Sequence, residues 1–180
     1  KIHALTKDES NIGVLLPNTF SDIGALLEMV DLVILTGGHD VTVDPQGIPI
    51  HESDDASKAR DLQEYRVFDL CITKGIPLIG VCRGMQFLAY FDGVGLKEIE
   101  GHVSIRHKIN GVVGSRTVNS YHNYTINNCP KNYEVIAYDD NNNIEAMKHV
   151  NLPWEGWMWH PEREKKFSKL DLERFRKLFI

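Results

Sequence analysis

Cys82 is the residue whose setting most clearly suggests chemistry. It lies between Gly80 and Gly84 in the run Gly-Val-Cys-Arg-Gly, after an apolar stretch of strand length and before apolar residues at helical spacing. This pattern predicts a tight strand-to-helix turn, in which a Cβ atom two residues before or after the cysteine would clash. We expect the turn to expose the thiol above the carboxyl edge of a sheet, where the start of a helix favours the thiolate. The alternative is a buried structural cysteine in a strand–helix unit.

A thiol nucleophile needs a base, and the base needs a group that orients it. Among the eight histidines, His160 is distinctive because it follows a predicted strand at residues 157–159 and stands two residues before Glu162. In an extended backbone, side chains two residues apart point the same way, and Pro161 disfavours a helical conformation at His160. We therefore expect the carboxylate to fix the tautomer of the imidazole, with an ordinary surface turn as the alternative.

The anion that forms when a carbonyl is attacked needs hydrogen-bond donors that are already in place. One candidate donor is the main-chain N–H of Arg83, directly after the cysteine. The other is the backbone of Gly37 and Gly38, which follow a predicted buried strand at residues 31–36; a plain turn explains Gly-Gly alone equally well. Because ligands bind at the carboxyl ends of the strands in open α/β sheets, we expect these segments and His160 to converge there.

Alternating strand and helix patterns predict an α/β fold. Predicted helices cover residues 22–30, 56–74 and 170–179, besides the helix after Cys82. Predicted strands cover residues 1–6, 13–17, 31–36, 102–107, 116–121, 134–138, 144–148 and 157–159, besides the apolar run before Cys82. Residues 139–143 predict a hairpin turn. Residues 7–12 are too few for a crossover between parallel strands, so we expect a connecting segment to be missing there.

Composition and charge limit the class of protein. With 180 residues, 42% hydrophobic and 25% charged, the chain suits one domain over residues 1–180. A net charge of −5 argues against a nucleic-acid partner, and no apolar run approaches the ~18 residues of a membrane span. The cysteines are odd in number and lack zinc-type spacing, which fits a reducing cytoplasm. We expect Cys71 in a helix core, Cys129 in a loop, and neither a metal nor a cofactor.

Three sequence segments together resemble the class I glutamine amidotransferase superfamily. They are Leu-Thr-Gly-Gly-His-Asp at residues 35–40, Gly-Val-Cys-Arg-Gly-Met-Gln at residues 80–86 and Trp-His-Pro-Glu-Arg at residues 159–163. Within the superfamily, the chain is similar to the free-standing γ-glutamyl hydrolases of the γ-glutamyl-γ-aminobutyrate hydrolase type, over most of residues 17–180. Residues 60–64 and 118–123 support the match. The resemblance implies a flavodoxin-like three-layer sandwich, with a mostly parallel sheet, helices on both faces and an antiparallel C-terminal extension.

The resemblance also implies roles for individual residues. Cys82 would be the nucleophile, His160 the base and Glu162 the group that orients it. Main-chain N–H groups of Gly38 and Arg83 would form the oxyanion hole, and the glutamyl group would be held by Gly37, Gln86, Ser120, Tyr121 and His122. The short N-terminal region and His39 depart from the family pattern.

Other cationic residues could bind an anionic leaving group. Arg60 lies on the predicted long helix, and Arg106 and His107 lie on the predicted strand at residues 102–107. For each of them a solvated surface position is an equal alternative. Trp154, Trp157 and Trp159 are expected to pack in the core, with a platform for a nucleobase or substrate as the alternative.

We therefore predict a cysteine-dependent hydrolase that cleaves a γ-glutamyl amide or phosphoramidate through a glutamyl thioester and releases glutamate. The resemblance makes γ-glutamyl-CDP-amidate, used in capsular polysaccharide biosynthesis, one candidate substrate. A glutaminase subunit that delivers ammonia to a separate synthetase is an alternative, and it would require a partner protein. A catalytically silent binding domain on the same fold is the other.

Overall fold

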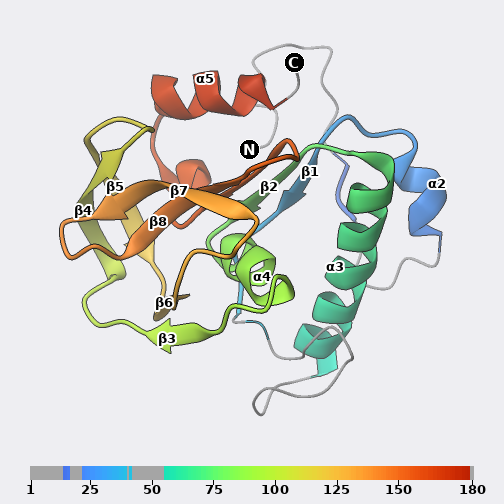
Figure 1. Ribbon diagram of the computed structural model, residues 1–180, viewed down its shortest axis with the longest axis horizontal. Helices are drawn as coiled ribbons and strands as arrows, with labels where there is room; N and C mark the ends of the chain where they lie inside the picture. The colour runs from blue at the N-terminus through green and yellow to red at the C-terminus, as the bar shows by residue number, and fades with distance from the viewer. Residues whose placement is uncertain (1–13, 17–21, 40, 42–54, 179–180) are drawn as a thin grey trace.

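A seven-stranded mixed sheet runs through the computed structural model, which describes residues 14–16, 22–39, 41 and 55–178 (Figure 1). The strand order is β1 (Val33–Leu35), β2 (Leu78–Val81), β9 (Trp154–Trp157), β8 (Ile144–His149), β7 (Tyr133–Asp139), β4 (Val103–Gly111) and β5 (Arg116–Tyr121). The pairs β1–β2 and β2–β9 are parallel, and the pairs from β9 to β5 are antiparallel. The α/β fold class is confirmed, and the antiparallel extension forms the larger part of the described sheet.

Helices cover both faces of this sheet, because neighbouring residues of a strand point to opposite sides. On one side, Leu78 of β2 packs with residues of α3 (Asp55–Lys74) and α4 (Arg83–Phe91). On the other side, Ile79 packs with Trp157, Trp159 and α5 (Lys169–Lys177). Figure 1 shows α5 lying on the opposite side of the sheet from α4. The three layers therefore agree with the predicted sandwich.

Smaller elements complete the described chain. Helix α2 (Ile23–Leu27) begins at Asp22, whose side chain accepts a hydrogen bond from the N–H of Ala25. A two-stranded antiparallel ribbon joins β3 (Leu96–Glu98) to β6 (Tyr124–Ile126). No helix in the described ranges is both long and apolar enough to cross a membrane.

Most predicted elements are present with small shifts of their ends, including β5 at residues 116–121 and the β7–β8 hairpin. The predicted position of the last strand is wrong: β9 covers Trp154–Trp157, so it begins three residues before the predicted segment 157–159 and ends two residues before its end. Strands β3 and β6 were not expected. Of the predicted strand at residues 13–17, only residues 14–16 are described, and they lie outside any strand. The predicted strand at residues 1–6 and the connection at residues 7–12 lie outside the described residues.

The strand register places three loops at one edge of the sheet. Leu35 of β1 is level with Gly80 of β2, and Gly80 is level with Gly156 of β9. Because the three strands are parallel, the segments that follow them leave the sheet on the same side. This edge carries the glycine pair, the cysteine and the histidine singled out from the sequence.

Candidate active site

Cys82 occupies a strained turn between β2 and α4. Its backbone has φ 51° and ψ −105°, a conformation that costs a residue other than glycine about 1–3 kcal/mol. A Cβ atom on Gly80 would lie 2.5 Å from the carbonyl carbon of Gly84, and one on Gly84 would collide with the carbonyl oxygen of Leu35. The glycines on either side of Cys82 are therefore required for α4 to pack this closely against β1 and β2.

The expectation that the thiol is exposed is wrong, since Cys82 is only 5% exposed. The turn follows β2, a strand with neighbours on both sides, and the N–H of Cys82 donates to the carbonyl of Trp157 at 2.7 Å. The flanking segments enclose the cysteine. Cys71 is in the helix core as expected, with no exposed surface, and Cys129 is half-buried in a loop.

His160 and Glu162 form the predicted pair. Nδ1 of His160 lies 2.6 Å from Oε1 of Glu162. Burial raises the pKa of Glu162, but the hydrogen bond and the charge of His160 outweigh it, so that the pKa is lowered from 4.5. Because the carboxylate accepts the Nδ1 hydrogen, Nε2 of the neutral ring carries a lone pair. Nε2 is buried and has no hydrogen-bond partner among the described residues, so it is available to a thiol, a substrate or water.

The backbone that brings these side chains together differs from the expectation. Glu162 lies in a short 3-10 helix, Pro161–Arg163, and not in an extended segment. His160 itself is outside the helix, with φ −108° and ψ 88°. Proline suits the first helical position because its missing N–H has no partner there. The turn of this helix brings the carboxylate back to the imidazole.

Asn119 on β5 holds the main chain of His160 on both sides, a role that sequence reasoning missed. Its Oδ1 accepts a hydrogen bond from the N–H of His160 at 2.8 Å, and its Nδ2 donates to the carbonyl of His160, also at 2.8 Å. Both residues are buried. The only signal in the sequence is that Asn119 belongs to the segment 118–123, which contributes to the resemblance.

Gly37 and Gly38 lie directly against the other parts of this edge. A Cβ atom on Gly37 would lie 2.6 Å from Cε1 of His160, and one on Gly38 would collide with the guanidinium of Arg60. Gly37 and Gly38 are therefore needed because their backbone lies directly against the side chains of His160 and Arg60, which a plain turn would not require. The pair lies beside the imidazole of His160.

A buried charge network connects the glycine loop with the start of α4. Arg60 donates to the carbonyls of Thr36 at 2.7 Å and Gly37 at 3.2 Å, and its Nε donates to Glu64 at 2.8 Å. Glu64 also pairs with Arg83, whose guanidinium is bound by Asp61 as well. The Arg83 side chain is 2% exposed. Arg60, which is partly exposed, thus holds the main chain of the loop at Thr36 and Gly37.

Gln86 and His122 meet at one carbonyl. Nε2 of Gln86 donates to the carbonyl of Tyr124 at 2.9 Å, and Nδ1 of His122 donates to the same oxygen at 3.0 Å. Oε1 of Gln86 is buried without a hydrogen-bond partner among the described residues. Ser120 is also buried, and its hydroxyl donates to the carbonyl of His102 at 2.6 Å. Oε1 of Gln86 and Nε2 of His122, which also lacks a hydrogen-bond partner among the described residues, are the atoms of this group left to receive a donor.

The remaining predicted contacts separate into two places. Tyr121 contacts the ring of His160, with ring centroids 5.7 Å apart, and the guanidinium of Arg163 lies 4.2 Å from the centre of the Tyr121 ring. Arg106 is half-exposed and pairs with Glu164 at 2.8 Å. His107, in contrast, points to a buried carboxylate, Glu145, with 3.5 Å between Nε2 and Oε2. It therefore belongs to a different cluster from Arg106.

Comparison with known proteins is consistent with this geometry. Residues 4–112 and 102–162 match the family described as Peptidase C26. Gamma-glutamyl-CDP-amidate hydrolase of Campylobacter jejuni is 30% identical over 151 residues, which are 84% of this chain and 72% of that protein. The glutamine-hydrolyzing GMP synthase subunit of Methanocaldococcus jannaschii is 28% identical over 175 residues, 89% of this chain and 82% of that protein.

Solved structures show the same fold. The crystal structure of a GMP synthase subunit protein from Thermoplasma acidophilum superposes with a TM-score of 0.69 at 19% identity, over 92% of this chain and 78% of that one. The fold and the site define a protein of the class I glutamine amidotransferase type. The chain belongs to the Peptidase C26 family, and it is an enzyme that hydrolyses carbon–nitrogen bonds.

Proposed function

We propose that this enzyme cleaves a γ-glutamyl amide through a glutamyl thioester on Cys82. The observation that carries the proposal is the position of Cys82 in a strained turn at the same sheet edge as the His160–Glu162 pair. Sγ attacks the γ-carbonyl carbon while its proton passes to Nε2 of His160. The carbon–nitrogen bond then breaks as His160 returns the proton to the departing nitrogen. Water deprotonated by His160 cleaves the thioester, which releases glutamate and restores the thiol.

Main-chain N–H groups would stabilise the oxyanion. The first N–H groups of a helix have no partner within the helix, and Arg83 is the first residue of α4. Gly38 supplies the second donor in this proposal, from the loop that Arg60 braces. The charge network between Arg60, Glu64 and Arg83 supports the arrangement because it ties both donor segments to α3.

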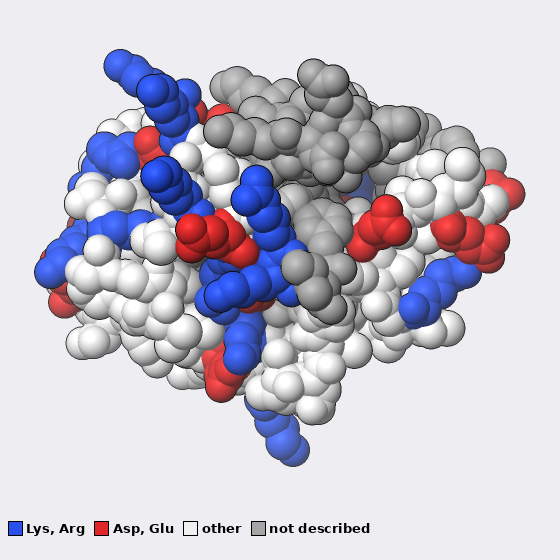
Figure 2. Space-filling model, turned by 90° about the horizontal axis from the view of Figure 1, so that it is seen from above, with Lys and Arg blue, Asp and Glu red and all other residues white. Residues whose placement is uncertain are grey.

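The glutamyl group would lie against Gln86 and the segment of Ser120, Tyr121 and His122. The unpartnered Oε1 of Gln86 is a suitable acceptor for the α-ammonium group. Tyr121 and Arg163 lie beside His160 and would face the leaving group. Figure 2 shows Lys and Arg gathered over one half of the face that carries α5, although the chain is acidic overall. Arg163 is a cation near His160 that could meet an anionic leaving group, as in γ-glutamyl-CDP-amidate, and the relative from Campylobacter jejuni supports such a substrate.

The second candidate is a glutaminase subunit that supplies ammonia to a separate synthetase. The similarity to the GMP synthase subunit of Methanocaldococcus jannaschii over 89% of this chain favours it. The two functions differ in whether the chain turns over unaided: a free-standing hydrolase needs no partner, whereas a subunit is slow on glutamine alone.

The deciding experiment measures glutamate release by the purified chain from γ-glutamyl-CDP-amidate, simple γ-glutamyl amines and glutamine. Replacement Cys82→Ala should abolish turnover on every substrate while circular dichroism stays unchanged, because it removes the nucleophile. Cys129→Ala is the matched control, since this half-buried thiol lies in a loop away from the site. Retained hydrolysis in Cys82→Ala would end the proposal. Slow release from glutamine and from the other substrates by the wild-type chain would favour the subunit.

A further inference from the structure

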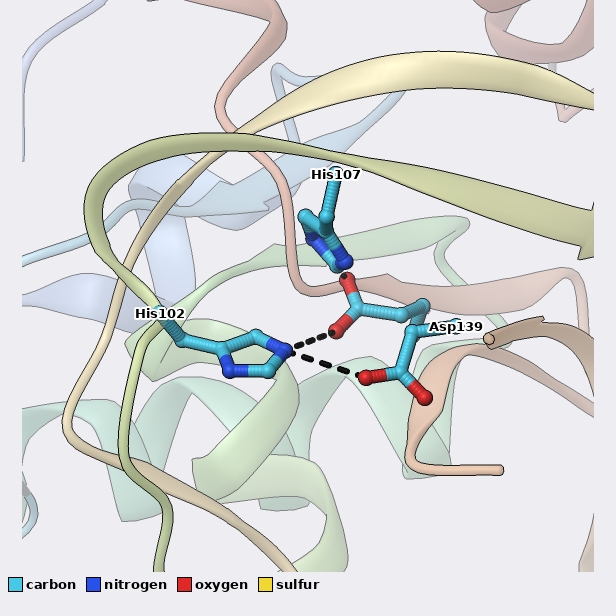
Figure 3. Close-up of side chains that lie close together, drawn as sticks. His102, His107 and Asp139 are labelled. Carbon is cyan, nitrogen blue, oxygen red and sulfur yellow. Dashed lines mark hydrogen bonds and ion pairs between the residues drawn. The ribbon is translucent and has the colours of Figure 1, made fainter. Parts of the chain in front are cut away.

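A second cluster of titratable groups lies on the antiparallel extension, apart from the Cys82 site. It contains His102, directly before β4, His107 on β4, Asp139 at the end of β7 and Glu145 on β8. One ligand atom from each of the four residues lies within 4.8 Å of the others. Figure 3 shows His102, His107 and Asp139 directed toward one common region. Sequence spacing did not indicate this cluster, because its members come from separate strands.

Glu145 is the group that most needs an explanation. It has no exposed surface, and neither of its carboxylate oxygens has a hydrogen-bond partner among the described residues. A buried carboxylate without partners is costly, so such groups are paired with a cation or bind a metal. Its nearest basic atoms are Nε2 of His107 at 3.5 Å, Nε2 of His122 at 3.7 Å and Nε2 of His102 at 3.9 Å.

Main-chain carbonyls fix the tautomers of two of these imidazoles. Nδ1 of His102 lies 3.1 Å from the carbonyl oxygen of Glu100, and Nδ1 of His122 lies 3.0 Å from that of Tyr124. A carbonyl only accepts, so Nδ1 carries the hydrogen in each ring. In the neutral rings both Nε2 atoms then hold lone pairs that face carboxylate oxygens. Metal-binding histidines are oriented in this way, by a hydrogen bond from the ring nitrogen that does not bind the metal.

The contacts of Glu145 fit coordination better than direct hydrogen bonding, whereas the contact between His102 and Asp139 also has an ordinary hydrogen-bond length. A tetrahedral zinc site with bonds of about 2.0–2.1 Å places its ligand atoms roughly 3.3 Å apart. Here Nε2 of His102 is 3.1 Å from Oδ2 of Asp139, and the contacts of Glu145 with His107 and His102 are 3.5 and 3.9 Å. The two contacts of Glu145 exceed the usual hydrogen-bond length of about 2.7–3.2 Å.

We propose that His102, His107, Asp139 and Glu145 bind one divalent transition-metal ion, for which Zn²⁺ is the best fit, with His122 beside them. Two carboxylates balance the charge of the ion, and imidazole is a preferred zinc ligand. The N–H groups of Asn141 and Asn143 already hold Oδ1 of Asp139, at 2.8 and 2.7 Å. Such hydrogen bonds are typical of carboxylates that bind metals.

Protonation is the competing explanation for the same cluster. Burial lowers the pKa of His107, but Glu145, together with Asp139 and Asp140, outweighs it, so that the pKa is raised from 6.5 and a proton on His107 would compensate Glu145 in place of a metal. Burial raises the pKa of Glu145, although His107 acts in the opposite direction. A metal ion removes the need for either proton. The bound ion would join β4, β7 and β8, and thereby support the end of β5, which carries Ser120 and is followed by His122.

The test measures metal content and thermal stability, so it is independent of the catalytic assignment. The full chain is freed of metal with a chelator, incubated with Zn²⁺ or Mn²⁺, passed through gel filtration and analysed by mass spectrometry for metals. We expect one zinc ion per chain, little manganese, and a higher melting temperature with Zn²⁺, because an ion that binds only the folded state stabilises it. A wild-type chain that retains no metal and shows no shift in melting temperature would overturn the proposal in favour of a protonated cluster.

Two ligand variants and one control localise the site. Glu145→Gln and His107→Gln should each weaken zinc binding at least about tenfold and remove the zinc-dependent rise in melting temperature. His149→Gln is the control, because His149 lies on β8 outside the cluster and should leave one zinc bound. If Glu145→Gln does not fold, the comparison rests on His107→Gln, whose side chain is at the edge of the cluster and 13% exposed. Zinc binding of wild-type strength in the folded ligand variants would contradict the assignment.

Discussion

Single residues at this site depend on a few short contacts. His160 is held through its main chain by Asn119 and through its ring by Glu162, so that neither the backbone nor the imidazole can rotate freely. Nε2 of His160 has no hydrogen-bond partner among the described residues, so this atom can transfer a proton to and from the substrate. The carboxylate fixes the tautomer, and it also stabilises the imidazolium that forms when His160 takes a proton.

Replacement Glu162→Gln should therefore lower kcat about 10²–10⁴-fold, because the amide can present an N–H to Nδ1 and favour the wrong tautomer.

The contribution of Glu162 to the stability of the folded chain should depend on pH. Since the pKa of Glu162 is lowered from 4.5, its ionised form stabilises the folded chain fully above this value and loses that effect as the pH falls through the folded pKa. Urea unfolding should show a gap between wild type and variant at pH 7 that closes in acid.

The exposed Glu173 on α5 provides the control for that experiment. Glu173→Gln should leave both kcat and the unfolding curves close to those of the wild type. Equal losses of activity in the two variants would show that Glu162 has no special role in orienting His160.

Among the elements, a buried network sets the distance between α3, α4 and the loop after β1. Glu64 pairs with both Arg60 and Arg83, whose side chains are 20% and 2% exposed. Two arginines that share one carboxylate lose much of their compensation when its charge is removed. Among the described residues, only Arg83 pairs with a further carboxylate, that of Asp61. The strained turn at Cys82 persists because the surrounding structure holds it in place.

Replacement Glu64→Gln should reduce the free energy of unfolding by about 2–4 kcal/mol, because it breaks a buried ion pair and leaves charge behind. It should also reduce kcat, since Gly37 and the start of α4 lose their common anchor. Glu134→Gln is the matched control: Glu134 pairs with Lys148 at 2.6 Å, but both side chains are about half exposed. Removal of this surface pair should cost less than about 1 kcal/mol. Urea unfolding that gives the same small loss for both variants would contradict a role for the network.

Across the molecule as a whole, the sheet divides the chemistry between two regions. The parallel strands β1, β2 and β9 carry the Cys82 site at their carboxyl ends, and the antiparallel extension carries the histidine–carboxylate cluster. The two regions meet at the carbonyl of Tyr124, which accepts hydrogen bonds from Gln86 and His122. Substrate selection depends on which groups border the site where the leaving group departs.

Arg163 is the cation that we expect to recognise an anionic leaving group, since it is about half exposed and lies over Tyr121 beside His160. Arg163→Ala should lower kcat/KM for γ-glutamyl-CDP-amidate about ten- to a hundredfold, which corresponds to the loss of a charge-assisted contact of ~1.5–3 kcal/mol. Glutamine, whose leaving group is ammonia, should be affected little.

The control for surface charge is Lys177→Ala, at the exposed end of α5. It should leave kcat/KM unchanged for both substrates at moderate salt concentration, because distant exposed charges are screened. Equal losses with Arg163→Ala on both substrates would favour a small-amine γ-glutamyl hydrolase.

Local features of this protein could be predicted from the order of its residues. The spacing of Gly80 and Gly84 around Cys82 predicts the turn, because only local sterics decide whether a Cβ atom fits there. The pairing of His160 with Glu162 was also predictable, since two residues of separation keep the side chains within reach of each other. That prediction was correct although the backbone is a 3-10 helix and not a strand.

The meeting of distant segments, in contrast, depends on the folded sheet. Asn119 contacts His160, and Arg60 contacts Gly37, because the order and register of strands place these residues together across 41 and 23 positions of sequence. The burial of Cys82 follows from the neighbours on both sides of β2. The sequence offers Arg106 and His107 together as candidates to bind an anionic leaving group, with solvated positions as the alternative. Adjacent residues of a strand point to opposite faces, however, and His107 faces the buried Glu145 of β8. Sheet order is a non-local property, so no spacing in the chain reveals it.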